Sequence, residues 1–196
     1  AAKVNLTVKY AIAGTAANGA DYASLPGTVL ILGGQSSAAI AVAPVDDNVG
    51  EVSETVTATL LSDAAYQNGS PTSGTVNIAD NEPSVSASAA DSTAAETATG
   101  VTANPGRFRI TRSGGSTAAD LTVGYTLGGT ATNGVDYLAL TGSATIAAGA
   151  TYVEITVTPL DDKLTEGLET AVLTIAAGTG YRVSMAAATV NINDND

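Results

Sequence analysis

The stretch GTAANGADY, from Gly14 to Tyr22, returns as GTATNGVDY, from Gly129 to Tyr137. The offset between the two copies is 115 (129 − 14), and the same offset carries Pro44 onto Pro159. Further along, the motif TVNIADNE of the first half aligns with TVNINDND at the end of the chain after one deleted residue. Self-similarity at a fixed offset is the sequence signature of repeated structural modules. The chain is therefore predicted to contain two homologous domains.

The two repeats are predicted to occupy residues 1–82 and 83–196. Residues 84–115, which include PGRFRITRSGG, have no counterpart before Ala1. The first repeat is therefore expected to lack the opening strand or strands, whereas the second is complete. We expect the chain to belong to a longer array whose first module is truncated here. A missing strand supplied by another chain is the alternative.

Apolar and polar residues alternate with a period of two through most of the chain. In YVEITVTP, Val153, Ile155 and Val157 point one way and the residues between them the other. Such alternation is typical of antiparallel strands with one wet face, and their spacing with Gly and Asn turns predicts sandwiches. RFRITR, at Arg107–Arg112, is predicted to be an edge strand with a basic outer face. No amphipathic helix is evident, so the predicted fold class is all-β, with two tandem antiparallel β-sandwiches.

Composition narrows the possible functions. Seven Lys and Arg stand against 19 Asp and Glu, which gives a formal net charge of −12. This balance argues against nucleic acid and anionic membranes as partners and favours cations. No apolar run is long enough to insert into a membrane. The chain has no Cys and no His, so the commonest proton shuttle, the thiolate nucleophile and the usual zinc ligands are missing. We therefore do not expect an enzyme.

The acidic residues gather in three short segments of each repeat: the NG-x-DY loop, a DD-x-x-x-E loop and a closing acidic triplet. All three segments follow predicted strands, and loops an even number of strands apart meet at the same end of a sandwich. Carboxylates crowded at one tip repel each other unless a cation lies among them. Acidic loops can also serve solubility alone, but such charges would have no reason to recur in the same register. Because Ca²⁺ prefers oxygen ligands in flexible geometry, the pattern favours calcium sites.

With these motifs in the same order, the chain resembles the Calx-beta domain family. The family comprises calcium-binding, immunoglobulin-like β-sandwiches of the sodium/calcium exchanger, an integrin and many extracellular proteins, bacterial ones included. In the second repeat the resemblance implies as ligands Glu96, Asp136, Asp161, Asp162, the carbonyl of Leu164, Glu166, Asp194 and Asp196. In the first repeat it implies Asp21, Asp46, Asp47, the carbonyl of Val49, Glu51, Asp80 and Glu82. The segment that would carry a counterpart of Glu96 is missing from the first repeat.

Two glutamates are left open by the motif. Glu54 and Glu169 either join the ligands or simply begin the next strand. Asn81 and Asn195 stand where the family has the middle acid of the triplet, which lowers the charge but keeps an oxygen. The NINDND ending also resembles the linker of cadherins, although the other acidic motifs of cadherins are missing.

We expect a calcium-stiffened structural or adhesive repeat segment of a large, bacterial, cell-surface or secreted protein. Its partners would be calcium ions and neighbouring repeats or other surface proteins. Two alternatives are a calcium-sensing module that switches a neighbouring domain and an accessory module of an extracellular enzyme. Calcium affinity discriminates the first of these, because constitutive extracellular sites can be weak whereas sensors bind more tightly.

Overall fold

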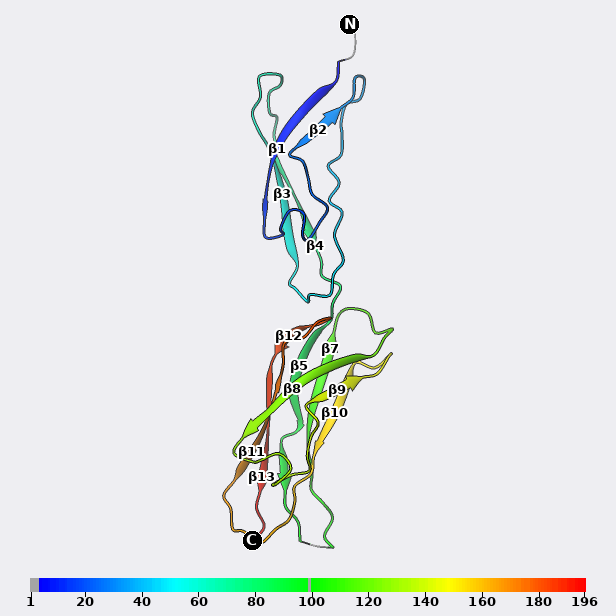
Figure 1. Ribbon diagram of the computed structural model, residues 1–196. Helices are drawn as coiled ribbons and strands as arrows, with labels where there is room; N and C mark the ends of the chain where they lie inside the picture. The colour runs from blue at the N-terminus through cyan, green and yellow to red at the C-terminus, as the bar shows by residue number, and fades with distance from the viewer. Residues whose placement is uncertain (1–3, 99) are drawn as a thin grey trace. The chain divides into compact units, whose positions relative to one another are not determined.

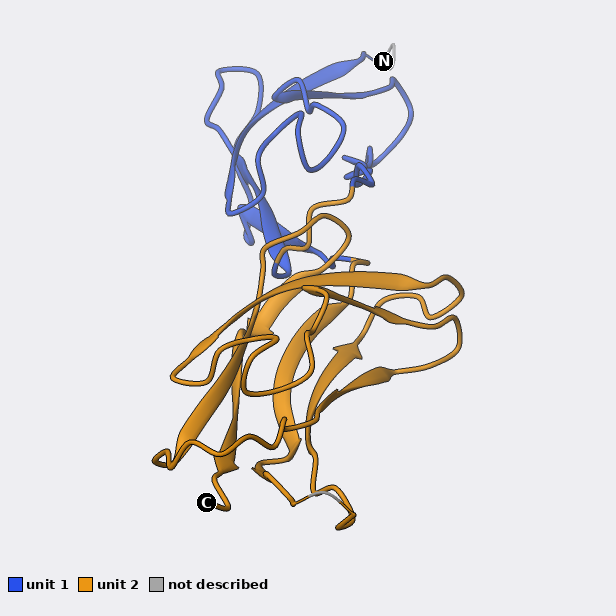
Figure 2. Cartoon of the chain, turned by 60° about the horizontal axis from the view of Figure 1, so that its bottom comes forward, with its two compact units in different colours: residues 1–47, 52–80 blue, residues 48–51, 81–196 orange. Residues whose placement is uncertain are grey.

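The computed structural model describes residues 4–98 and 100–196, and every regular element in them is a β-strand (Figure 1). The fold class is therefore all-β, as predicted. The chain divides into two compact units, unit 1 with residues 1–47 and 52–80 and unit 2 with residues 48–51 and 81–196 (Figure 2). Within the described residues, no helix has the length and hydrophobicity needed to cross a bilayer.

Unit 1 contains one antiparallel sheet in the order β2-β1-β3-β4. Its strands are β1 (Leu6–Gly14), β2 (Thr28–Ile31), β3 (Glu54–Leu60) and β4 (Ser73–Ile78). The buried cluster of this unit is small and centres on Ala16, Tyr22 and Val56. No second sheet faces this one among the described residues of the unit.

Unit 2 is a complete sandwich of two sheets, in the orders β10-β7-β5-β12 and β6-β13-β11-β8-β9. Its strands are β5 (Ser84–Asp91), β6 (Thr93–Ala95), β7 (Gly106–Ser113), β8 (Leu121–Gly129), β9 (Ser143–Ile146), β10 (Tyr152–Val157), β11 (Glu169–Ile175), β12 (Arg182–Met185) and β13 (Ala187–Asn193). Most pairings are antiparallel. Two short ones, β12 with β5 and β13 with β6, are parallel and depart from the purely antiparallel prediction.

The core of unit 2 follows from the alternation of its strands. Phe108 and Ile110 of β7 are fully buried and pack in one cluster with Leu173 of β11 and Val190 of β13. These side chains come from both sheets, so the two inner faces close over one another. The large aromatic and branched residues supply most of the apolar area that stabilises the unit.

A glycine at the end of β8 sets the path of the following loop. Gly129 has a φ of +109°, and a Cβ at this position would lie 2.0 Å from the carbonyl oxygen of Thr170. Only glycine tolerates this approach. The same carbonyl oxygen accepts a hydrogen bond of 3.0 Å from the N–H of Ala131. Gly14 and Thr55 repeat the arrangement in unit 1, so the NG-x-DY loop leaves its sheet in the same way in both repeats.

The prediction for RFRITR is wrong in one respect. β7 is an inner strand that pairs with both β5 and β10 rather than an edge strand. Arg112 lies on the same face as Phe108 and Ile110 and is only 4% exposed. Its guanidinium donates four hydrogen bonds to the backbone carbonyls of Thr117, Ala119, Ala147 and Ala150. The carbonyl oxygens replace the water that Arg112 loses on burial, so its buried charge is tolerated. Arg112 thereby connects two loops, a role that the basic sequence pattern does not indicate.

Candidate metal centre

The acidic cluster of the second repeat begins with Glu96, the residue that follows β6. The parallel pairing of β6 with β13 sets Ala95 opposite Asn193, and the N–H of Glu96 donates to the carbonyl oxygen of Asn193 at 2.9 Å. The glutamate therefore lies beside the start of the closing triplet. Glu96 is only 5% exposed, and its Oε2 is buried without a hydrogen-bond partner among the described residues.

The NG-x-DY loop is folded around its own aspartate. Asp136 Oδ2 accepts a hydrogen bond of 2.6 Å from the N–H of Thr132, and its carbonyl oxygen accepts one of 3.0 Å from Leu160. The next residue, Tyr137, is fully buried and forms a bridge with Pro159. Burial of this tyrosine ties the loop to the end of β10, directly before the DD pair.

The DD pair and the closing triplet hold one another by short hydrogen bonds. Asp162 Oδ1 accepts from the N–H of Leu164 at 2.7 Å, and Asp161 Oδ1 accepts from Asn195 Nδ2 at 3.0 Å. Asp194 Oδ2 accepts from the N–H of Glu166 at 2.6 Å. Segments 34 and 28 residues apart in the chain thus meet at one tip.

Asp136, Glu166 and Glu169 bring their carboxylates together in the second repeat. One carboxylate oxygen from each lies within 4.8 Å of those of the other two. Glu169 is the first residue of β11, and its Oε2 is buried without a partner among the described residues. Glu169 therefore begins the strand and also lies beside the other carboxylates, and its ligation of a metal stays a prediction.

The electrostatics of the cluster are unfavourable to several ionised carboxylates at once. Burial is the largest cause that raises the pKa of Glu96 to about 7, and the charges of Asp194, Asp162, Glu166 and Asp161 supply the rest of the rise. Burial likewise raises the pKa of Glu166 and of Glu169, with Asp136 as the next cause for both.

Asp194 behaves in the opposite way. The backbone N–H groups of Asp196 and Glu166 hold the pKa of its carboxyl below the usual range. Asp194 therefore stays ionised beside Glu96, because hydrogen bonds to a carboxylate favour its charged form.

The first repeat shows part of the same arrangement. One carboxylate oxygen of Asp21 lies within 4.8 Å of one of Glu54, as in the pair Asp136 and Glu169. Asp21 Oδ2 accepts from the N–H of Ala17 at 2.5 Å, as Asp136 does from Thr132. Tyr22 is fully buried and forms a bridge with Pro44. The local fold of the NG-x-DY loop is thus the same in both repeats.

The structure gives less information about the other predicted ligands. Asp46, Asp47 and Val49 are exposed, and Asp80 and Glu82 are half-buried on the segment that follows β4. In the second repeat the side chain of Leu164 is 63% exposed, and Asp196 donates its N–H to Asp194 Oδ1 at 3.1 Å. For these residues, metal ligation stays a prediction.

Comparison with protein families identifies one match. The family model described as the Calx-beta domain matches residues 1–82 and 90–196. A comparison with curated proteins finds no match.

A comparison with solved structures lists three matches with low sequence identity. The crystal structure of the apo form of the Calx CBD1 domain is 21% identical, with a TM-score of 0.47, and the match covers 59% of this chain and 99% of that one. The structure of CBD12 from CALX1.2 is 17% identical, with a TM-score of 0.41, and covers 98% and 88%. The calcium binding domain CBD12 of CALX1.1 is 18% identical, with a TM-score of 0.41, and covers 97% and 88%.

Proposed function

The chain belongs to the Calx-beta family, and we propose that its repeats bind Ca²⁺ at their acidic tips as part of a structural segment of a cell-surface or secreted protein. Calcium would be held constitutively and would limit the freedom of the chain between the repeats. The chain would act as a binding module and not as a catalyst. Its partners would be calcium ions and neighbouring repeats or other surface proteins.

The single observation that carries the calcium proposal is the environment of Glu96. A carboxylate oxygen that is buried, unpartnered among the described residues and surrounded by four further carboxylates lacks a positive group. A divalent cation would replace the lost hydration, and its attraction for each carboxylate would outweigh the repulsion between them.

The donor set fits calcium better than other common metals. The clustered groups are carboxylates, and an amide side chain lies beside them at Asn195. Ca²⁺ takes about six to eight oxygen ligands in flexible geometry, whereas Mg²⁺ retains several waters and accepts fewer protein carboxylates. Zinc sites are built from Cys and His, and the chain has neither.

The backbone prepares the site in the absence of the ion. Hydrogen bonds from Thr132 to Asp136 and from Leu164 to Asp162 fix one oxygen of each of these carboxylates, and Asp194 accepts from Glu166 at one oxygen and from Asp196 at the other. The three carboxylates are thereby oriented, which lowers the entropy that binding must remove. Glu96, Glu166 and Glu169 would then contribute the more movable oxygens, because their side chains are longer.

The proposed structural role rests on how short the connection between the repeats is. β4 ends at Ile78 and β5 begins at Ser84, and the residues between them include the acidic triplet Asp80-Asn81-Glu82 followed by Pro83. Flexible linkers are rich in Gly and Ser, and this connection contains neither. Calcium held by the triplet would restrict its backbone. The proposal includes an extracellular location. Calcium levels outside cells are high enough to keep even weak sites occupied.

Thermal unfolding with calcium and with chelator tests the proposal. Calcium at a hundred times its dissociation constant is expected to stabilise the folded state by about 2.7 kcal/mol. Asp136→Asn keeps the acceptor for Thr132 and should reduce the response of the second repeat, whereas Asp21→Asn should reduce that of the first. An unchanged melting temperature in excess calcium would refute calcium binding. A micromolar or tighter affinity with a change of shape in solution scattering would indicate a sensor instead of a structural segment.

A further inference from the structure

Asparagine followed by glycine occurs three times in the chain, at Asn18-Gly19, Asn68-Gly69 and Asn133-Gly134. In this dipeptide the backbone nitrogen of the glycine can attack the side-chain amide carbon of the asparagine, because glycine has no Cβ to shield its nitrogen. Two of the copies belong to the NG-x-DY loops of the two repeats. The third lies in the loop between β3 and β4, and its surroundings differ from those of the other two.

The NG-x-DY loop of the second repeat holds both reacting groups in place. Asn133 Nδ2 donates to the carbonyl oxygen of Leu140 at 3.2 Å, and its Oδ1 accepts from the N–H of Leu140 at 2.9 Å. The attacking nitrogen is also engaged, since the N–H of Gly134 donates to the carbonyl oxygen of Tyr137 at 3.0 Å. Three hydrogen bonds must therefore break before the nitrogen of Gly134 can reach the amide carbon of Asn133.

The first repeat protects its copy in the same way. Asn18 Nδ2 donates to the carbonyl oxygen of Leu25 at 3.3 Å, and its Oδ1 accepts from the N–H of Leu25 at 2.9 Å. The N–H of Gly19 donates to the carbonyl oxygen of Tyr22 at 3.1 Å. The asparagines of both NG-x-DY loops thus hold a turn together, and neither amide is free to close a ring with the next residue.

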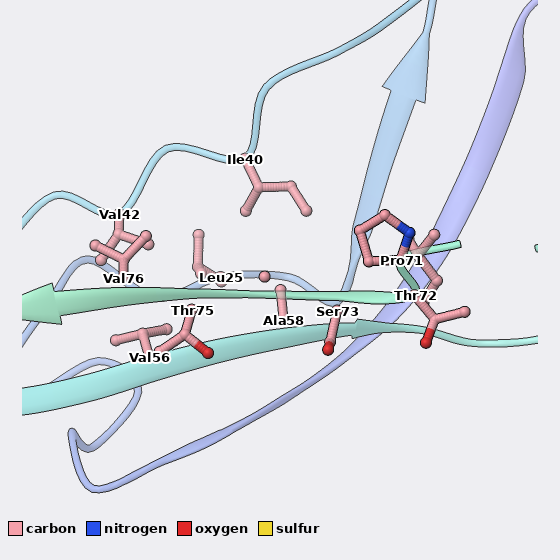
Figure 3. Close-up of a pocket in the computed structure, with 12 residues that line it drawn as sticks. Leu25, Ile40, Val42, Val56, Ala58, Pro71, Thr72, Ser73, Thr75 and Val76 are labelled. Carbon is pink, nitrogen blue, oxygen red and sulfur yellow. The ribbon is translucent and has the colours of Figure 1, made fainter. Parts of the chain in front are cut away.

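Asn68 is held less firmly. It is exposed, and its Nδ2 donates to the carbonyl oxygen of Leu60 at 3.4 Å, which is long for a hydrogen bond. Among the described residues, no acceptor pairs with the N–H of Gly69, and a Cβ built on Gly69 would meet no atom within 4 Å. The loop reaches β4 through Pro71 and Thr72, which Figure 3 shows beside the start of that strand. The attacking nitrogen and the amide carbon can therefore approach one another here without breaking the fold.

We propose that Asn68 is a site of spontaneous deamidation, whereas the fold protects Asn18 and Asn133. A base in the solvent removes the proton from the nitrogen of Gly69, and this nitrogen forms a bond to Cγ of Asn68. The Cγ–Nδ2 bond breaks, and the leaving group takes up a proton and departs as ammonia. Water then adds to either carbonyl carbon of the resulting succinimide ring, which yields aspartate or isoaspartate. Water is the co-reactant.

The modification changes the charge of unit 1. Conversion makes the formal net charge of −12 more negative by one unit, and residue 68 loses the amide group that donates to Leu60. Isoaspartate also adds a methylene group to the backbone of the loop. The proposal does not depend on calcium binding, because Asn68 lies outside the acidic segments of the first repeat.

The test follows the folded 196-residue protein at mildly alkaline pH by mass spectrometry. Cleavage before aspartate places Asn18, Asn68 and Asn133 on separate peptides, and the protein unfolded in guanidinium gives the reference rate for each position. We expect Asn68 to react in the folded protein at a rate close to its reference, whereas the lost hydrogen bonds should slow the other two by about tenfold or more. Protection of Asn68 equal to that of Asn133 would overturn the proposal.

Two matched variants test the ring closure. Gly69→Ala adds a Cβ in open space, so the melting curve should be unchanged, but the methyl group shields the nitrogen and should slow the reaction of Asn68 several-fold or more. Gln67→Ala changes the exposed residue on the other side of Asn68 and should leave the rate unchanged. Equal rates in the two variants would overturn the proposal, because direct hydrolysis of the amide does not use the glycine nitrogen.

Discussion

Replacing Glu96 by glutamine is expected to stabilise the calcium-free protein at neutral and alkaline pH. The carboxyl group of Glu96 is buried, one of its oxygens has no partner among the described residues, and four carboxylates raise its pKa further. Glutamine has the same shape and carries no charge. The substitution therefore removes the repulsion while leaving the packing around β6 in place.

The magnitude follows from the pKa of about 7, against an ordinary value of 4.5. For an acid whose pKa is raised by folding, stability is greatest below the ordinary pKa and falls as the pH rises through the folded pKa. Because one pKa unit corresponds to about 1.4 kcal/mol, ionised Glu96 destabilises the calcium-free fold by on the order of 3 kcal/mol at about pH 8. The penalty shrinks to less than about 1 kcal/mol near pH 4.5, where the carboxyl is protonated in the folded state.

Denaturant or thermal unfolding in chelator measures this difference. For a domain of this size, 3 kcal/mol corresponds to a rise of roughly 10–15 °C in the melting temperature at about pH 8, with little change near pH 4.5. Glu154→Gln is the matched control, because it breaks the surface ion pair with Arg109 and should cost up to about 1 kcal/mol. Two substitutions of the same type should thus act in opposite directions.

Calcium should narrow the difference in stability between the two proteins. With the ion present, Glu96→Gln loses a negatively charged ligand, so its calcium-induced stabilisation should be smaller than that of the natural sequence by about 1.4 kcal/mol or more, equivalent to tenfold in affinity. If the variant were less stable than the natural sequence in chelator at pH 8, the reasoning from buried like charge would be refuted.

Three further substitutions test other parts of the structure. Arg112→Met removes one donor from each of four backbone carbonyls, although those of Thr117 and Ala147 still accept from the N–H groups of Gly149 and Ala150. It should destabilise unit 2 by about 2–5 kcal/mol in denaturant unfolding; a change below about 1 kcal/mol would contradict the buried role of the arginine. Gly129→Ala forces a Cβ against the carbonyl of Thr170 and should lower stability by about 2 kcal/mol or more, whereas an unchanged melting curve would speak against the close approach. Glu169→Gln should weaken calcium binding by about tenfold in calorimetric titration, and unaltered affinity would return Glu169 to a purely structural role at the start of β11.

Much of the acidic tip could be anticipated because its residues recur. Near strand ends lie Asp136, Glu166 and Asp194 of the second repeat, and so do their counterparts in the first. Period-two alternation identifies where those strands run. The sequence does not show whether Glu169 belongs to the acidic cluster, because a glutamate that opens a strand has the same local pattern whether or not its side chain turns toward the cluster. Only the 4.8 Å separation from Asp136 and Glu166 distinguishes the two cases.

For Arg112, the charge pattern predicts exposure, whereas its position in the alternation of the strand predicts burial. The basic residues of RFRITR suggested a wet edge, yet Arg112 shares the face of Phe108 and Ile110 by the same period-two rule. That signal was present in the spacing. The four carbonyls that make its burial tolerable come from residues 117–119 and 147–150, and no local pattern reveals that these loops converge on it.

The repeat, the all-β class and the position of the acidic segments at strand ends can be derived from the sequence, because alternation and recurrence are local properties of a chain. The burial of Glu96 and the convergence of four loop carbonyls on Arg112 cannot be derived in this way. Both depend on residues that pack against a side chain from distant parts of the chain, and these neighbours set the desolvation that controls the charge of Glu96.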